Sequence, residues 1–135
     1  MTEEELMIGD LVQVNDEVCK VISISYFDIG ISDSKEDFYN EHIDNIKPIP
    51  LTTEILEKNF DSEKVDFEGR HISTRYTDRN EFRDIVIAEY TDGMWEVKID
   101  DVDFSDPPTW KVYVCDVHEL QHALRLCSIN KEIKL

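Results

Sequence analysis

The residues best suited to chemistry lie near the end of the chain, in the segment His118-Glu119-Leu120-Gln121-His122. This segment matches the HExxH pattern of zinc metallopeptidases. Histidines four residues apart share one face of a helix and can both ligate Zn²⁺, while the glutamate polarises the attacking water. In that interpretation His118 and His122 are metal ligands and Glu119 is the general base.

The helix that carries this segment is expected over residues 116–127, and its apolar positions argue against a zinc centre. At about 100° per residue, His118 and His122 fall roughly opposite the apolar side of the helix. We therefore expect both imidazoles to face solvent, whereas a zinc peptidase directs them into a cleft. The apolar side is formed by Val117, Leu120, Ala123, Leu124 and Cys127.

Three further observations favour a structural interpretation of the motif. Asp116 and Glu119 have the spacing of a capping box, so Glu119 is expected to satisfy backbone N–H groups at the helix start. No Gly-x-x-His follows His122, and Glu132 is the sole carboxylate residue after it. A chain of 135 residues also leaves little room for a substrate cleft. We expect no enzyme activity and no catalytic, cofactor-binding or metal-binding residues, with the zinc peptidase as the alternative.

Other catalytic patterns are absent from the sequence. The chain has four glycines and no GxxxxGK[ST], GxGxxG or GxSxG segment, so phosphate-cradling loops and a nucleophile elbow are not expected. Cys19, Cys115 and Cys127 are odd in number and form no CxxC pair. We expect them to be free, buried thiols, and we expect no cofactor.

The charge balance bears on the choice of partner. The chain has 31 acidic and 14 basic residues, a net charge of −17, and a field of this sign repels nucleic acid. We expect no direct nucleic-acid binding. The acidic residues are scattered, which favours a solvated surface that keeps the protein soluble. The other interpretation is that the carboxylates face a basic partner protein, for example by imitating DNA phosphates.

The composition also bounds the type of protein. Hydrophobic residues make up 41% of the chain, which is enough to bury a core. No apolar run approaches the roughly 18 to 20 residues that span a bilayer, so no membrane association is expected. The acidic start, Met1-Thr2-Glu3-Glu4-Glu5-Leu6, lacks the positive and apolar regions of a secretory signal. We therefore expect a cytoplasmic protein.

Residues 1–50 are expected to form five short strands. Residues 18–25 alternate between a mainly apolar face, Val18, Lys20, Ile22 and Ile24, and a mixed face, which is typical of a half-buried strand. With the opening Gly9-Asp10 turn, this arrangement resembles a small SH3-like β-barrel. Tyr26, Phe27, Phe38 and Tyr39 are assigned to its core rather than to a peptide groove. The expected strands are 11–14, 18–25, 27–32 and 37–43, followed by a helical turn and a short edge strand within 43–50.

Residues 51–135 are expected to form a helix, an antiparallel meander and a final helix, which makes the whole an α+β fold with subdomains 1–50 and 51–135 sharing one core. Thr52 or Thr53 can cap the first helix, over residues 54–60. Asp92-Gly93 predicts a type I′ hairpin turn. After the first helix we expect a break at 61–63, a weak strand 69–76, a turn 77–80 and a strand 84–90. After the hairpin turn we expect a strand 94–100 with Trp95, Val97 and Ile99 inward, a loop 101–108 and a strand 110–115.

Three segments carry a family resemblance. Residues 49–60, Ile-Pro-Leu-Thr-Thr-Glu-Ile-Leu-Glu-Lys-Asn-Phe, fit an IPLT-x-E-x-L-x-K pattern; residues 117–122 fit VH-x-LQN, and residues 6–12 fit LRIGN-x-V. The chain thereby resembles a family of uncharacterised small proteins of gut-type Bacteroidetes genomes, phages and mobile elements. In that family the position of His122 is usually Asn and that of Glu119 often Gln. The resemblance implies that HExxH arose by drift in a non-catalytic helix, within a phage or mobile-element background.

These observations together predict a non-enzymatic accessory or interaction protein. Its acidic surface would prefer a basic protein partner. Two alternatives come from other classes: the zinc metallopeptidase-like enzyme described above, and a DNA-mimicking inhibitor of a nucleic-acid-processing enzyme.

Overall fold

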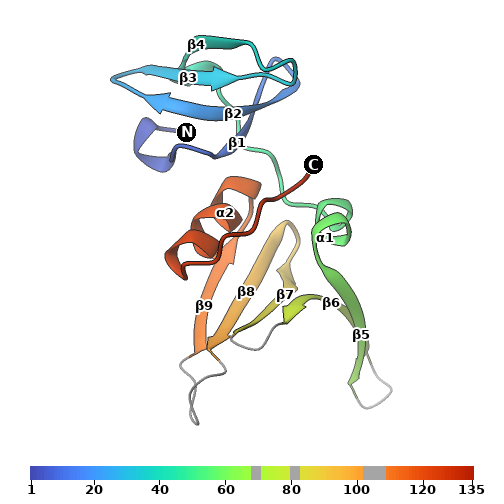
Figure 1. Cartoon of the computed structure of the whole chain (residues 1–135). Helices are drawn as coiled ribbons and strands as arrows, with labels where there is room; N and C mark the ends of the chain where they lie inside the picture. Colours follow the sequence, from blue (N-terminus) through green and yellow to red (C-terminus); the bar gives the residue numbers. More distant parts are fainter. Residues whose placement is uncertain (68–70, 80–82, 102–108) are drawn as a thin grey trace. The chain divides into compact units, whose positions relative to one another are not determined.

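The computed structural model describes residues 1–67, 71–79, 83–101 and 109–135 (Figure 1). The described chain contains two antiparallel sheets and two α-helices, so the expected α+β class is confirmed. It divides into two compact units, one of Met1–Pro50 with Asp116–His122 and one of Leu51–Cys115 with Ala123–Leu135. The sequence-based division into 1–50 and 51–135 had assigned Asp116–His122, which includes the HExxH motif, to the second part.

The first unit is built on an open sheet of four strands in the order β1-β2-β3-β4. Its sheet does not close, so the expected SH3-like barrel is not confirmed. The expected short edge strand is an isolated antiparallel bridge, in which Gln13 and Lys47 exchange backbone hydrogen bonds of 2.8 and 2.9 Å. The elements are the 3-10 turn η1 (Glu3–Glu5), β1 (Leu11–Val14), β2 (Glu17–Ile24), β3 (Asp28–Ser32), β4 (Phe38–His42) and the 3-10 turn η2 (Ile43–Asn45).

The core of the first unit lies on one face of this sheet. On β2 the buried residues are Cys19 and Val21, while Val18, Ile22 and Ile24 are exposed. The mainly apolar face of the strand is therefore the outer one. The remaining core residues are Leu6, Val12, Val14, Ile29, Ile31, Ile43 and Ile46.

Four aromatic residues assigned to this core by sequence lie instead at the surface. Tyr26 is 78% exposed and Phe38 71%, and Phe27 and Tyr39 are exposed as well. The assignment of all four to the core is wrong. Small aliphatic residues fill the interior of the unit, and the large rings remain outside it.

The predicted hairpin at Asp92-Gly93 is observed, with Thr91 paired to Met94, but the type I′ turn occurs in a different hairpin. Asn15 and Asp16 have φ of 50° and 63° and connect Val14 to Glu17, which are paired across β1 and β2. Positive φ at both central residues defines the type I′ turn. In the predicted Asp92-Gly93 turn, Gly93 has a φ of 78°, but Asp92 is not among the residues with positive φ.

The second unit contains a five-stranded meander in sequential order, β5 to β9. Helix α1 begins as expected, because the Thr52 hydroxyl accepts a 3.3 Å hydrogen bond from the Ile55 N–H. The elements are α1 (Thr53–Asn59), β5 (Asp61–Phe67), β6 (His71–Arg79), β7 (Arg83–Thr91), β8 (Met94–Asp101), β9 (Thr109–Val114) and α2 (Val117–Leu126), the last of which begins in the first unit.

Two expectations for this unit are wrong. The expected break at residues 61–63 is the start of β5, and residues 77–79 of the expected turn are the end of β6. Both segments pair along their length, from Asp61–Thr77 to Phe67–His71. Residue 80 of that turn, the start of the expected strand 69–76 and most of the loop 101–108 lie outside the described residues.

The interior of the second unit follows the predicted alternation of β8. Trp95, Val97 and Ile99 are buried, and the Trp95 indole donates a 3.0 Å hydrogen bond to the Leu51 carbonyl. Tyr76 meets the Trp95 ring edge-on at 6.1 Å. These contacts confirm the inward face of β8.

Two simpler expectations concern the thiols and the helices. Cys19, Cys115 and Cys127 are free, with Cys19 buried and the other two half-buried. Within the described residues, neither α-helix has the length and apolarity needed to cross a bilayer.

The Asn15-Asp16 turn gives a test of the backbone assignment. Glycine at position 16 has no Cβ to strain a φ of 63°, so Asp16→Gly should stabilise the fold by about 0.5 to 1 kcal/mol. Urea unfolding measures the change. Asp16→Ala removes the same carboxylate but keeps a Cβ, and it should be no more stable than the parent. Equal stabilisation by both substitutions would show that charge, and not backbone conformation, is responsible.

Candidate functional site

The site begins with the turn that precedes β1. Gly9 has a φ of 95°, a region that favours glycine. Its N–H donates to the Val21 carbonyl at 2.7 Å, and the Asp10 carbonyl accepts from the Val21 N–H at 2.9 Å. The edge of β2 thus fixes this turn, and the Asp10 side chain is fully buried.

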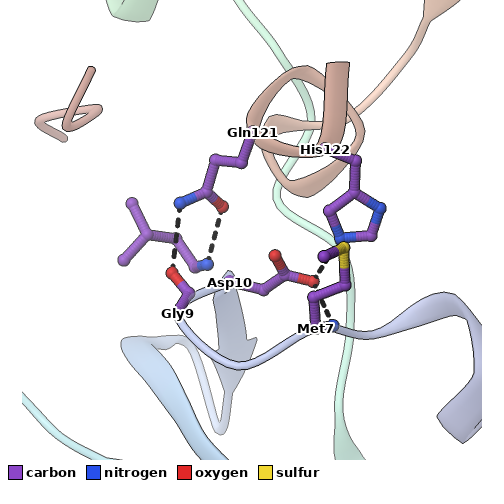
Figure 2. Close-up of polar contacts among 6 residues, drawn as sticks. Met7, Gly9, Asp10, Gln121 and His122 are labelled. Atoms are coloured by element: carbon purple, nitrogen blue, oxygen red, sulfur yellow. Dashed lines mark hydrogen bonds and ion pairs between the residues drawn. The ribbon is translucent and has the colours of Figure 1, made fainter. Parts of the chain in front are cut away.

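Asp10 and the first turns of α2 form a set of polar contacts that we call the Asp10 clamp: Gly9, Asp10, Leu11, Gln121 and His122 (Figure 2). Asp10 Oδ2 lies 2.7 Å from His122 Nε2 and also accepts the Met7 N–H at 2.8 Å. The Gln121 side chain accepts from the Leu11 N–H at 2.8 Å and donates to the Gly9 carbonyl at 3.2 Å. The clamp therefore joins residues more than 100 positions apart.

Both histidines of the HExxH motif are turned away from solvent. His118 is 5% exposed, and the side chain of His122 is 23% exposed. Their rings meet edge to face, with centroids 5.5 Å apart. The expectation that both imidazoles face water is therefore wrong.

The error has a structural cause. The helical wheel assigned one buried face to α2, but the start of this helix also contacts residues of the first unit on its polar side. The Val117 N–H donates to the Ile49 carbonyl at 2.8 Å, and Asp116 forms an antiparallel bridge with Pro50. With the clamp, these backbone contacts cover the side that carries the histidines.

His118 is buried as a neutral ring. Burial lowers the pKa of its imidazole, and His122 acts in the same direction; the carboxylates of Asp10, Glu119 and Glu5 oppose the shift. Among the residues that the structure describes, the buried His118 Nδ1 has no hydrogen-bond partner.

Asp116 and Glu119 interact through their carboxyl groups. Burial raises the pKa of Asp116 to about 6, helped by a hydrogen bond to Glu119 and by the negative charge of that residue. The pairing of these two residues, suggested by their capping-box spacing, thus takes the form of a carboxyl–carboxyl contact.

The motif residues all have contacts within the protein. His122 Nε2 lies against the Asp10 carboxylate, and Glu119 contacts Asp116. In the described part of the chain, no three His, Cys, Asp or Glu side chains are arranged so that they could hold a metal ion. These contacts give His122 and Glu119 partners within the protein, while the absence of enzyme activity stays a prediction.

The HExxH pattern does not point to Asp10, because its third ligand is expected downstream of His122 and Asp10 lies far upstream. The two residues are 112 positions apart. Asp10 lies in a Gly-Asp turn and His122 in a helix, and neither local pattern predicts a contact between them. A polar Gln121-His122 pair at the helix start is the one local sign that this side of the helix has a polar contact.

A second candidate surface lies at the turn between β2 and β3. We call it the aromatic cluster: Tyr26, Phe27 and His42. The rings of Tyr26 and Phe27 meet edge-on at 4.1 Å, and Phe27 stacks on His42 at 6.1 Å with an interplanar angle of 8°. All three side chains are exposed.

The backbone of this turn holds the cluster in an uncommon conformation. Phe27 has a φ of 66°, which is rare for a bulky residue and is found most often at functional sites. Its carbonyl accepts the Ile43 N–H at 3.0 Å, and the Ser25 N–H donates to the Asp28 carbonyl at 3.0 Å. Hydrogen bonds on both sides of Phe27 therefore hold the backbone of the turn that carries the exposed rings.

Two carboxylates flank the aromatic cluster. Asp28 is the partner of His42 in the β3–β4 register. Asp44 Oδ2 lies 3.4 Å from His42 Nδ1. The cluster thus combines exposed aromatic faces with negative charge.

Comparison with known proteins adds no family to this description, because no family model, curated protein or solved structure matches the chain. The functional argument therefore depends on the geometry of the two sites.

The raised pKa of Asp116 predicts a pH-dependent cost to stability. A carboxyl group whose pKa rises on folding stabilises the fold below its ordinary value of 3.8 and loses that contribution as the pH rises through about 6. Asp116→Asn should therefore stabilise the protein at pH 7.5, by about 1 kcal/mol after allowance for solvent screening. The gain should shrink below pH 6 and be smallest near pH 4.

Urea unfolding at several pH values measures this effect. Asp92→Asn, in an exposed turn of the second unit, is the control for the loss of one negative charge from a chain of net charge −17. If the two variants gain stability equally at every pH, the local environment of Asp116 is not the cause.

Proposed function

We propose that this protein is a non-enzymatic interaction protein that binds a basic segment of a partner protein through the aromatic cluster. The observation that supports this most directly is the exposed Tyr26–Phe27 pair, on a turn where Phe27 has positive φ. The two rings contact each other and His42, but both remain exposed, so part of each ring lacks apolar cover. A partner would supply the missing contact.

The chemistry of the cluster favours a positively charged partner. A Lys or Arg side chain over an aromatic face gains roughly 0.5 to 1 kcal/mol at an exposed site and about 2 kcal/mol when it loses water. Asp28 is paired with His42 across β3 and β4, and the Asp44 carboxylate lies 3.4 Å from the His42 ring, so two acidic residues adjoin His42. The net charge of −17 would speed the approach of a basic partner.

The first unit is proposed to be an SH3-like module that stays open. Its β-meander, the 3-10 turn η2 and the Gln13–Lys47 bridge follow the element order of such a barrel. Barrels of this kind often bind peptides, although fold alone does not assign function. The family resemblance of the sequence adds a phage or mobile-element background to the proposal, and a cytoplasmic location goes with it.

The proposal predicts that Tyr26→Ala weakens the binding of a lysine-rich peptide about three- to tenfold, because one aromatic face is lost. Fluorescence titration with a labelled peptide of lysines and serines measures the affinity. A peptide of the same length with glutamates in place of lysines should not bind.

The matched control is Tyr90→Ala. Tyr90 is 58% exposed, and its ring centroid lies 4.7 Å from that of Tyr113. The two residues form an exposed aromatic pair of the second unit. This variant should bind the lysine-rich peptide as the parent does. Equal losses in both variants, or no loss in either, would contradict the assignment of binding to the aromatic cluster.

A further inference from the structure

A cavity of about 420 Å³ lies within the first unit, beside the start of α2. It is separate from the aromatic cluster, with which it shares no residue. Seven residues line it: Met1, Glu5, Pro48, Asp116, His118, Glu119 and His122. The HExxH residues therefore form one wall of a space large enough for a small ligand.

The lining of this cavity favours positive charge. Three of its residues are carboxylic acids, Glu5, Asp116 and Glu119; none is Lys or Arg, so the α-ammonium of Met1 is the one cationic group among the seven. Burial lowers the pKa of the His118 ring, which disfavours its cationic form. An anion would meet repulsion here, whereas a cation would meet oxygen and nitrogen acceptors.

A second and independent observation points to a ligand. His118 is 5% exposed, and its Nδ1 is buried without a hydrogen-bond partner in the part of the chain that the structure describes. An unpaired buried polar atom costs about 1 to 3 kcal/mol, and each one in a native protein requires an explanation. Because His118 lines the cavity, a small rotation of its ring would bring Nδ1 to the cavity surface, where a donor from a ligand would supply this missing hydrogen bond.

We propose that the cavity binds an alkylammonium ion, that is, the amine of a lysine side chain or of a free diamine. An ammonium group has three N–H donors. They match Glu5, the Asp116–Glu119 pair and the His118 ring, while Met1 and Pro48 contact the methylene stem. A metal ion fits less well, because no three of the described ligand-type side chains are arranged around one point.

This inference does not rest on the proposed function, because the cavity and the aromatic cluster are different sites. Either could bind its ligand if the other did not. An experiment on the cavity therefore needs its own probes and its own variants.

The experiment is an NMR titration of the labelled full chain with putrescine, with N-acetyl-lysine methylamide and with 1,4-butanediol. Butanediol has the length of putrescine but no charge. We expect both amines to shift the His118 ring signals in a saturable way, and butanediol to leave them unchanged. A response to putrescine alone would assign the site to free diamines, and a response to both would assign it to the lysine side chain as well.

A pair of adjacent variants provides the structural control. Glu5→Gln removes a carboxylate of the cavity wall, whereas Glu4→Gln removes the neighbouring exposed carboxylate, which is not part of the wall. Both residues are on the surface, so neither change should affect folding. Glu5→Gln should weaken amine binding about tenfold, and Glu4→Gln less than about twofold.

Three results would overturn the proposal. The first is an equal loss of affinity in the Glu4 and Glu5 variants, which would mean non-specific attraction to an acidic surface. The second is binding of butanediol as tight as that of putrescine. The third is saturable, stoichiometric binding of Zn²⁺ at His118 with no response of the ring to either amine.

Discussion

The buried carboxylate of Asp10 is the interaction on which the described sites most depend. A charge removed from water is costly unless hydrogen bonds compensate for it. Asp10 is 0% exposed, and it receives the Met7 N–H at 2.8 Å and the His122 ring at 2.7 Å. The compensation requires the start of α2 to stay beside the Gly9–Asp10 turn. One carboxylate therefore constrains the rotation of a helix from the other end of the chain.

The cavity follows from that constraint. Because His122 contacts Asp10 and Gln121 binds the backbone of Gly9 and Leu11, the side of α2 with His118 and Glu119 is turned toward η1 and Pro48. The HExxH spacing thus has a structural basis in this chain. His122 belongs to both the clamp and the cavity wall, and His118 to the cavity wall. Residues at i and i+4 lie on one helix face. In a metal centre both histidines would bind one ion, whereas here one ring contacts Asp10 and the other lines the cavity.

Local structure in this chain could be predicted from the sequence where it depends on neighbouring residues. The Thr52 cap, the alternation of Trp95, Val97 and Ile99, and the final helix were all expected and are observed. A type I′ turn requires positive φ at both central residues. In this chain Asn15 and Asp16 meet that requirement without a glycine. Short-range rules thus identify elements better than they identify the particular turn.

The rest could not be predicted because it depends on tertiary contacts. The exposed face of β2 contains Val18, Ile22 and Ile24, so the more apolar face of this strand is not the buried one. The exposed aromatic residues follow the same pattern. The Asp10–His122 contact spans 112 positions, and no local sequence pattern at either residue indicates that the two are in contact. The HExxH motif can be recognised in the sequence. The direction in which its histidines point cannot, because it depends on contact with Asp10, which is far away in the chain.

A double-mutant cycle on Asp10 and His122 tests the central claim most directly. Urea unfolding at pH 7 would give the free energies of the parent, Asp10→Asn, His122→Gln and the double variant. The account predicts a coupling energy of about 1 to 3 kcal/mol between the two residues. The exposed Arg79–Glu63 pair, 3.2 Å apart, is the reference cycle and should give well under about 1 kcal/mol. A coupling for Asp10 and His122 no larger than that reference would contradict the account.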